Sequence, residues 1–372
     1  MSNPSAESPD DPAVERLDRS QLLAWLVDQE LPVDPDQPLE AELLARGRSN
    51  VTYRIRQGAS DSDGIDWVVR RQPFGHVMPS AHDMAREHRV ISGVYAGGFP
   101  VPQPIALCED PDVIGSVFHV MGYMPGLVMG AATETAHLTP PQARDLSHEI
   151  VSTLAQLHAI DANEVGLGEL GRPEGFLIRQ AARWRSQWDL SQTRDQPLAI
   201  DLADRLTARV ENVPAGAPWS IVHGDYRLDN TIVDPETMRI RAVVDWEMST
   251  LGDPLSDLAL LLVYWTRPTD RLLKRLPLVD GVTDHEGFID RRELVDTYAS
   301  ASGRDVDHLD VCIALSCFKL AVILESIRKR ILAGAQVGSA AGQADLMGQA
   351  TDVLLELGLA SLEGDALEAL GS

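Results

Sequence analysis

The sequence predicts an α+β protein in which a strand-rich N-terminal region is followed by a larger, mostly helical region. Up to about residue 125, short apolar segments that tend to alternate are separated by Gly, Pro, Asn and Asp. From residue 139 onward, apolar residues recur every three or four positions over long segments, as in amphipathic helices. One hairpin interrupts these helices, because two apolar segments flank a Pro-containing turn at 235–238. This order of elements is typical of the α+β class.

The N-terminal region is expected to contain one main helix among its strands. Residues 1–15, rich in Pro, Ser and Asp, are expected to be disordered, and Ser20 to cap a helix over 20–31. The main helix is predicted over 80–98, with Ser80 as its cap and Gly97–Gly98 at its end. The predicted strands lie at 39–58 (two strands around a turn with Gly47, Ser49 and Asn50), 66–73, 101–110 and 116–126.

The C-terminal region is expected to consist of helices around the hairpin. The first helix, over 139–161, begins with a cap residue followed by Pro. The hairpin follows "SIVHGDYRLDN", in which Ile221 and Val222 should lie in a strand or at its end. The other helices are predicted at 175–190, 196–211, 255–265, 290–301, 306–333 and 340–361.

The composition restricts the possible partners of the protein. Of its 372 residues, 44% are hydrophobic and 24% are charged, which is ordinary for a soluble globular protein. The net charge of −24 argues against binding to nucleic acid or anionic membrane, because phosphate groups would be repelled. No apolar run could span a bilayer, and the acidic N-terminus does not resemble a signal peptide. The scattered Cys108, Cys312 and Cys317 indicate buried thiols, so a cytoplasmic location is expected.

Lysine is rare in this chain. Lys274, Lys319 and Lys329 all lie in its last hundred residues, so every earlier basic side chain is Arg or His. Any site in the first two thirds that needs a permanent cation must therefore use Arg.

Polar side chains at the strand ends have the types and order that phosphoryl transfer requires. The transferred group is highly charged, so Mg²⁺ with oxygen ligands, a phosphate-binding cation and a carboxylate beside the acceptor hydroxyl are needed. Asp225 can be the base, and Asn230 and Asp245 can be metal ligands. Arg70 can bind the phosphates, with Glu87 holding it in place.

This ordered set, with "HGDYRLDN" followed by "VVDWE", resembles the aminoglycoside phosphotransferase and choline kinase family of small-molecule kinases. "RGRSNVTYRI" is similar to the nucleotide-covering first hairpin of that family. "WVVRRQPFGHVMPSAHDMAREHRVI" and "DWEMSTLGDPLSDLA" are similar to the branch related to the kinase-like domain attached to some acyl-CoA dehydrogenases. The resemblance covers roughly residues 35–335, nearly the whole chain.

The resemblance implies roles for individual residues in catalysis. Asp225 matches the catalytic base, and Asn230 and Asp245 match the magnesium ligands. Arg70 stands where most of the wider family has Lys, although Arg looks usual in this branch. Glu87 matches the helix Glu that pairs with that cation.

Further positions match the nucleotide site and the support of the catalytic loop. Ser49 and Asn50 lie in the hairpin that would cover the nucleotide. Met121 and Tyr123 lie in the linker between the lobes, whose backbone would bind the adenine ring. Asp257 matches a helix Asp that supports the catalytic loop, although it is equally consistent with a helix cap.

The implied architecture is a bilobal protein-kinase-like fold, with a small antiparallel-sheet lobe and a larger helical lobe. We expect an N-terminal extension with a helix over 1–34, a nucleotide-covering lobe over 35–120, a hinge over 121–125 and a C-terminal lobe over 126–372. The implied enzyme moves the γ-phosphate of ATP, or of GTP, to an alcohol group of a small molecule and requires Mg²⁺. The sequence does not determine the oligomeric state.

Other interpretations stay open. The chain could be a catalytically weak, nucleotide-binding pseudokinase that acts as an interaction module, or a metal-dependent hydrolase. Asp225 and Asn230 also suit a turn, and Arg70 and Glu87 could form a surface ion pair. The family name suggests an aminoglycoside acceptor, whereas the branch suggests a hydroxyacyl-CoA or another metabolite. Residues 270–360 carry both basic and acidic runs, and we favour the metabolite.

Overall fold

The protein is described here by a computed structural model, which covers residues 17–46, 50–58, 64–72, 83–214, 219–277, 281–334 and 340–371. The chain divides into two compact units. The N-terminal unit comprises Met1–Pro125 and Ala242–Glu247, and the C-terminal unit comprises Gly126–Arg241 and Met248–Ser372.

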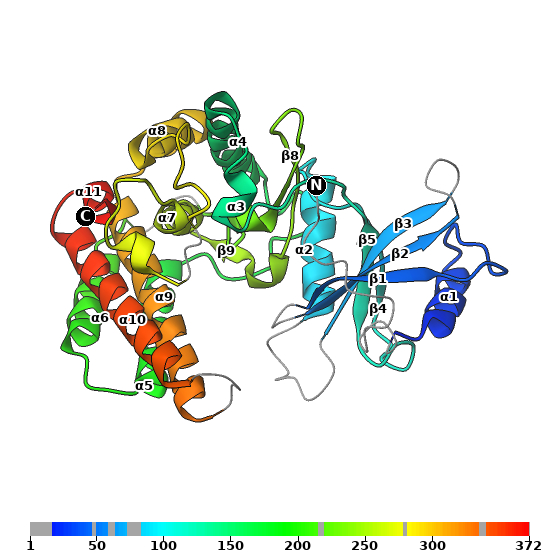
Figure 1. Cartoon of the computed structure of the whole chain (residues 1–372), viewed down its shortest axis with the longest axis horizontal. Helices are drawn as coiled ribbons and strands as arrows, with labels where there is room; N and C mark the ends of the chain where they lie inside the picture. Colours follow the sequence, from blue (N-terminus) through cyan, green and yellow to red (C-terminus); the bar gives the residue numbers. More distant parts are fainter. Residues whose placement is uncertain are drawn as a thin grey trace. The chain divides into compact units, whose positions relative to one another are not determined.

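A five-stranded antiparallel sheet forms the centre of the N-terminal unit (Figure 1). The strands lie in the order β1-β2-β3-β5-β4. Their bounds are Glu40–Arg46 for β1, Val51–Gln57 for β2, Ile65–Arg71 for β3, Pro104–Cys108 for β4 and Phe118–Gly122 for β5. The register of β3 and β5 pairs Arg70 with His119, so these two side chains share one face of the sheet.

The two helices of this unit, α1 (Arg19–Asp28) and α2 (Met84–Ala96), cover opposite faces of the sheet (Figure 1). Buried Leu22 and Leu26 of α1 belong to one apolar cluster with strand residues such as Phe118. Because strand side chains alternate between faces, Arg70 and its cross-strand partner His119 point to the other face of the sheet, towards α2. The predicted strands and the main helix are confirmed.

Both predicted helix caps in this unit need revision. Asp18, not Ser20, caps α1, and its carboxylate accepts hydrogen bonds from the backbone N–H groups of Ser20 and Gln21. Asp83 caps α2 and accepts from the N–H of Arg86, whereas Ser80 lies outside the described residues. In both helices a carboxylate two or three residues from the expected Ser binds the free N–H groups at the helix start. The predicted end of α2 at Gly97–Gly98 is confirmed.

The C-terminal unit is mainly helical. All seven predicted helices of this region are confirmed within a few residues, and Thr139 begins the first with a capping box that includes Gln142. The helices are α3 (Ala132–Thr135), α4 (Pro140–Ala159), α5 (Phe176–Ser191), α6 (Pro197–Val210), α7 (Leu255–Tyr264), α8 (Arg291–Ser302), α9 (Leu309–Leu332), α10 (Ala340–Glu363) and α11 (Ala366–Leu370), with short 3₁₀ turns at Leu228–Asn230, Trp246–Met248 and Leu273–Arg275.

Two short strand pairs position the polar loops among these helices. β6 (Ser220–Val222) pairs with β9 (Thr250–Gly252), a strand that the sequence did not predict. The predicted hairpin is confirmed as β7 (Thr231–Val233) and β8 (Ile240–Val243). The chain therefore leaves β6 directly into His223-Gly224-Asp225.

A pair of long helices, α9 and α10, lies side by side in the C-terminal unit (Figure 1). Helix α9 is apolar over much of its surface and buries a long run of side chains, including Phe318 and Leu324. Among the described residues, none of the helices combines the length and apolar character needed to cross a membrane.

Candidate active site

The loop that follows β6 is shaped by a glycine. Gly224 has a φ of 83°, and a Cβ at this position would lie 2.6 Å from the carbonyl oxygen of Met248. Any other residue would be strained there and would collide with backbone. The neighbouring His223 is buried, and its Nδ1 accepts a hydrogen bond from the N–H of Asp225 at 3.2 Å. The loop is thus held in one conformation, with Asp225 following it.

The predicted base and the first predicted metal ligand lie in contact. Nδ2 of Asn230 donates to the backbone oxygen of Asp225 at 2.8 Å and to its Oδ2 at 3.0 Å. The 3₁₀ turn Leu228–Asn230 brings the amide back to the carboxylate, which explains the five-residue spacing. Within the described residues, no donor occupies the amide oxygen of Asn230, so an oxygen ligand remains available beside Asp225.

Asp257 supports the loop from helix α7, as predicted. Its carboxylate accepts hydrogen bonds from the N–H groups of His223 at 2.6 Å and Gly224 at 2.8 Å. It is therefore not a helix cap; Asp253 serves that end of the helix by accepting from the N–H of Leu255 at 2.9 Å.

Asp257 is itself held by a buried histidine. Nε2 of His158 lies 3.3 Å from Oδ2 of Asp257, and Nδ1 lies 2.8 Å from the hydroxyl of Tyr298. Burial lowers the pKa of His158, so the ring is neutral and donates its one N–H to the carboxylate. Burial acts to raise the pKa of Asp257, but the hydrogen bonds from His158 and from the N–H of Gly224 hold it below its ordinary value. Asp257 thus stays ionised and accepts both loop N–H groups.

Lys319 of α9 completes the support of the loop, and sequence reasoning did not assign it a role. Its Nζ donates to the backbone oxygen of Gly224 at 2.8 Å. Burial lowers its pKa, while the carboxylates of Asp225 and Asp257 act in the opposite direction. A signal was present in the sequence, since a lysine within "CFKLAV" interrupts an otherwise apolar helix segment.

Two basic side chains, those of Arg227 and Lys319, interact with Asp225. Nε of Arg227 lies 3.4 Å from Oδ2 of Asp225, and Nη2 of Arg227 lies 2.9 Å from Oδ2 of Asp229. Lys319 interacts electrostatically with Asp225, and also with Arg183 of α5. These two basic side chains and three carboxylates therefore lie near the loop in the C-terminal unit. The carboxylates are those of Asp225, which also contacts Asn230, and of Asp229 and Asp257.

The predicted residues of the N-terminal unit form a second cluster, centred on Arg70. Its Nε lies 3.1 Å from Oε1 of Glu87, and its Nη2 lies 2.5 Å from Oδ1 of Asp245 and 3.8 Å from Oε2 of Glu247. The side chain of Glu87 is 1% exposed and that of Arg70 is 14% exposed. The predicted pair is confirmed, and the interpretation as a surface ion pair is wrong.

One guanidinium in this cluster faces three carboxylates. Burial acts to lower the pKa of Arg70, but the carboxylates of Glu87, Asp245 and Glu247 outweigh it and raise that pKa. Burial raises the pKa of Glu87 to about 7, and Asp245 and Glu247 act in the same direction. The excess of negative charge suits a divalent cation with oxygen ligands. Asp245 has a φ of 68°, a left-handed conformation that is uncommon outside glycine and often occurs at functional sites.

The remaining predicted nucleotide-site residues have different surroundings. Nδ2 of buried Asn50 donates to Oε2 of Glu247 at 3.0 Å, which joins Asn50 to the Arg70 cluster. Met121 is buried in β5, and the N–H of Tyr123 already donates to the backbone oxygen of Asp66 at 3.0 Å. Ser49 lies outside the described residues. The roles of these residues remain predictions.

Comparison with known proteins gives one family and consistent relatives. Residues 40–294 of this chain match the family described as "Phosphotransferase enzyme family". Acyl-CoA dehydrogenase family member 11 of Gallus gallus is 34% identical over 86% of this chain, and that of Homo sapiens is 32% identical over 77%. The matched regions are 40% and 36% of those relatives, so the chain spans well under half of their length.

Solved structures have the same fold. A Ralstonia eutropha protein, provisionally described as an aminoglycoside phosphotransferase, has a TM-score of 0.75 and 30% identity, over 93% of this chain and 98% of that one. A thermostable mutant aminoglycoside phosphotransferase in ternary complex with AMP-PNP and hygromycin B has a TM-score of 0.56 and 14% identity, over 90% of this chain and 98% of that one. The second likeness concerns the fold alone. The predicted protein-kinase-like fold, with a sheet-containing N-terminal part and a helical C-terminal part, is confirmed.

Proposed function

Since the chain belongs to the phosphotransferase enzyme family, we propose that it is a small-molecule kinase that transfers the γ-phosphate of ATP, or of GTP, to an alcohol group. The observation that carries the proposal is the hydrogen-bonded pair of Asp225 and Asn230, in a loop whose backbone is fixed by Asp257 and Lys319. A related fold in complex with AMP-PNP supports a nucleotide donor.

Asp225 is the proposed catalytic base. The Nδ2 group of Asn230 fixes one oxygen of its carboxylate, and the other oxygen can accept the proton of the acceptor hydroxyl. Because the loop is held at the backbone of residues 223 and 224, the carboxylate orients the hydroxyl without reorganisation of the loop. In phosphoryl transfer this positioning accounts for much of the rate enhancement.

Asn230 and Asp245 are the proposed oxygen ligands for Mg²⁺. Bound magnesium would neutralise the charge of the transferred phosphoryl group. Arg70, which stays positively charged, is the proposed phosphate-binding residue, and buried Glu87 orients its guanidinium. Asn50, Ser49 and the backbone of Met121 and Tyr123 would contact the nucleotide; the carbonyl of Tyr123 is the available group, since its N–H is engaged.

The acceptor is proposed to be anionic, with a hydroxyacyl-CoA or a similar metabolite as the favoured class. Arg227 lies beside the carboxylate of Asp225 and Lys319 donates to the loop carbonyl of Gly224, and these cations would repel a polycationic aminoglycoside. The phosphates of a coenzyme A group, or a carboxylate, would be attracted instead. A location in the cytoplasm, with ATP and this acceptor as partners, completes the proposal.

A nucleotide screen followed by an acceptor panel tests the proposal. Thermal unfolding with ATP and GTP, each with and without Mg²⁺, should show stabilisation that requires the metal. Nucleotide consumption should then be measured with hydroxyacyl-CoA compounds and with aminoglycosides. Stabilisation without turnover of any alcohol would favour the pseudokinase, and phosphate release from phosphate esters without ATP would favour the hydrolase. Turnover of aminoglycosides alone would contradict the anionic acceptor.

Asp225→Asn is the decisive variant. We expect turnover to fall by about 10²–10⁴-fold, because the base is lost while the side chain keeps its shape. The matched control is Asp229→Asn, which removes another carboxylate paired with Arg227 four residues further on. If turnover falls equally in the two variants, the activity depends on negative charge near Arg227 and not on a base at Asp225.

A further inference from the structure

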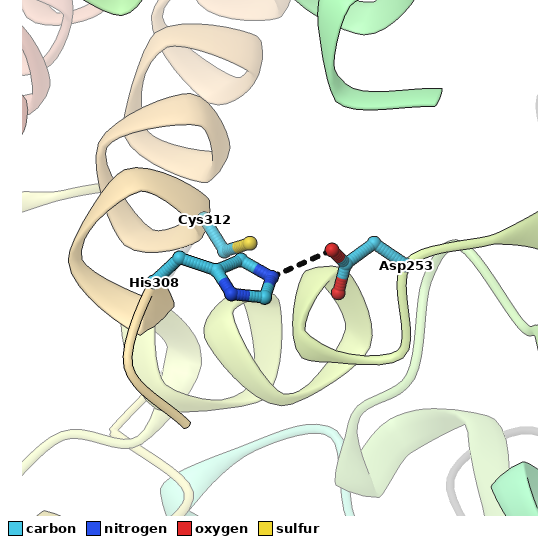
Figure 2. A group of neighbouring side chains, drawn as sticks. All are labelled: Asp253, His308 and Cys312. Atoms are coloured by element: carbon cyan, nitrogen blue, oxygen red, sulfur yellow. Dashed lines mark hydrogen bonds and ion pairs between the residues drawn. The ribbon is translucent and has the colours of Figure 1, made fainter. Parts of the chain in front are cut away.

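A second cluster of ligand-type side chains lies at the start of helices α7 and α9, and the proposed reaction does not use it (Figure 2). Asp253, His308 and Cys312 each offer one ligand atom, and these atoms all lie within 4.8 Å of one another. Figure 2 shows Cys312 and His308 on neighbouring turns at the start of α9, facing Asp253 just before α7. Carboxylate oxygen, imidazole nitrogen and thiolate sulfur are the three ligand types that zinc takes from proteins.

The cluster is built on rigid elements. His308 is the residue that precedes α9, and Cys312 lies four positions later, so both side chains occupy the same face of the helix. Oδ1 of Asp253 accepts from the N–H of Leu255 at 2.9 Å, which orients the carboxylate and leaves Oδ2 directed at Nε2 of His308, 2.7 Å away. Such a backbone hydrogen bond to a ligating carboxylate is typical of the second layer around metal sites.

The surroundings favour a cation. Asp305 and Asp310 interact electrostatically with His308, in addition to Asp253. Cys312 and Asp253 are both buried, and no described residue forms a hydrogen bond with the thiol of Cys312. Two basic side chains are described near these carboxylates: Arg209 pairs with Asp310, and Arg304 directly precedes Asp305. The buried thiol of Cys312 thus lies beside carboxylates and an imidazole but has no hydrogen-bond partner among the described residues. A bound metal ion would be such a partner.

We propose that Asp253, His308 and Cys312 form a binding site for one Zn²⁺ ion, which links the starts of helices α7 and α9. In a tetrahedral site with bonds of 2.0–2.3 Å, ligand atoms lie roughly 3.5 Å apart, so Oδ2 and Nε2 must separate by about 1 Å. A water molecule would fill the fourth position. Because α7 also carries Asp257, and α9 carries Lys319, the ion would fasten together the two helices that support the Asp225 loop.

Zinc binding by the 372-residue chain tests this site. Dialysed protein, kept with excess Mg²⁺ and ADP to occupy the proposed nucleotide site, should bind one Zn²⁺ per chain by metal analysis. Co²⁺ in its place should give a thiolate-to-cobalt charge-transfer band. Cys312→Ser and His308→Gln should remove the band or weaken binding at least about tenfold. Cys317→Ser, which changes another buried thiol of α9, is the matched control and should bind as the wild type does.

Two results would overturn the proposal. Zinc bound equally well by Cys312→Ser, His308→Gln and the wild type would place the ion elsewhere. The second result is a wild-type protein that is folded by circular dichroism but does not bind zinc stoichiometrically. In that case Asp253 and His308 form an ordinary hydrogen bond and no metal site. Neither result depends on kinase activity, so the proposed function is tested separately.

Discussion

At the scale of single residues, the fold strongly perturbs the ionisation of the buried carboxylate of Glu87. It shares Arg70 with Asp245 and Glu247, and burial raises its pKa from 4.5 to about 7. The folded protein therefore binds a proton here between these two pH values, whereas the unfolded chain releases it. The free energy of unfolding must fall as the pH rises through this range.

We expect Glu87→Gln to remove this pH dependence. The difference in unfolding free energy between wild type and variant should change by on the order of 3 kcal/mol between pH 4.5 and 7, with the wild type losing stability as the pH rises. Urea denaturation at several pH values measures it. Glu236→Gln, at an exposed glutamate of the hairpin turn, is the control and should follow the wild type. Parallel profiles for wild type and Glu87→Gln would contradict the assignment.

At the scale of elements, the loop after β6 is held from two helices. Asp257 of α7 binds two of its N–H groups, and Lys319 of α9 binds its Gly224 carbonyl. These three hydrogen bonds involve charged side chains and backbone, which makes each stronger than a neutral one. They determine where Asp225 points, and this makes Lys319 a positioning residue in the proposed reaction.

Lys319→Met should lower the rate of phosphoryl transfer about tenfold or more with little change in KM for the nucleotide. The loss of a hydrogen bond to a charged donor corresponds to about 1.5–3 kcal/mol, and here it loosens the loop that carries the base. Steady-state kinetics measure both constants, and Lys319→Arg should recover part of the rate. The matched control is Lys329→Met on the exposed part of α9, where Nζ donates to the carbonyl of Leu190. If both methionine variants lose the same activity, Lys319 has no special position.

The elements show which parts of the structure a sequence can predict. Helix α4 was predictable because its cap, its Pro and its apolar spacing are local signals. Asp225 and Asn230 were selected because they stand in an ordered motif that resembles a kinase family, and the structure brings them together through a local 3₁₀ turn. Lys319 was missed because its contact with Gly224 spans 95 positions, and no local pattern reports such a contact. Strand β9 was missed for the same reason, since its three residues are a strand only through pairing with β6.

At the scale of the whole molecule, charge is distributed unevenly. The chain has a net charge of −24, yet two basic side chains, Arg227 and Lys319, contact one loop of the C-terminal unit. Overall acidity keeps such a protein soluble, whereas the local cations decide which substrate is attracted. The preference for an anionic acceptor should therefore weaken as salt rises, because screening reduces attraction between exposed charges. A KM for a hydroxyacyl-CoA that does not change with ionic strength would argue against this.

The packing of the helical layer has to keep α9, and with it Lys319, in a fixed position. Helix α10 approaches α9 and α6 closely at Gly358, where an added Cβ would lie 2.7 Å from Cδ2 of Leu202 and 3.3 Å from Cβ of Cys317. Leu202 and Cys317 are both buried, so they have little room to move. Near the start of the same helix, a Cβ added to Gly342 meets nothing within 4 Å.

Two glycine-to-alanine changes in α10 should consequently change the free energy of unfolding in opposite directions. Gly358→Ala should lower the free energy of unfolding by about 1–2 kcal/mol, because overpacking outweighs the better helix propensity of alanine. Gly342→Ala should raise it by up to about 1 kcal/mol, since only the propensity changes. Urea denaturation measures both. If Lys319 depends on this packing, Gly358→Ala should also lower turnover while Gly342→Ala leaves it unchanged. A stabilised Gly358→Ala protein would show that α10 does not pack closely against α9 at this position.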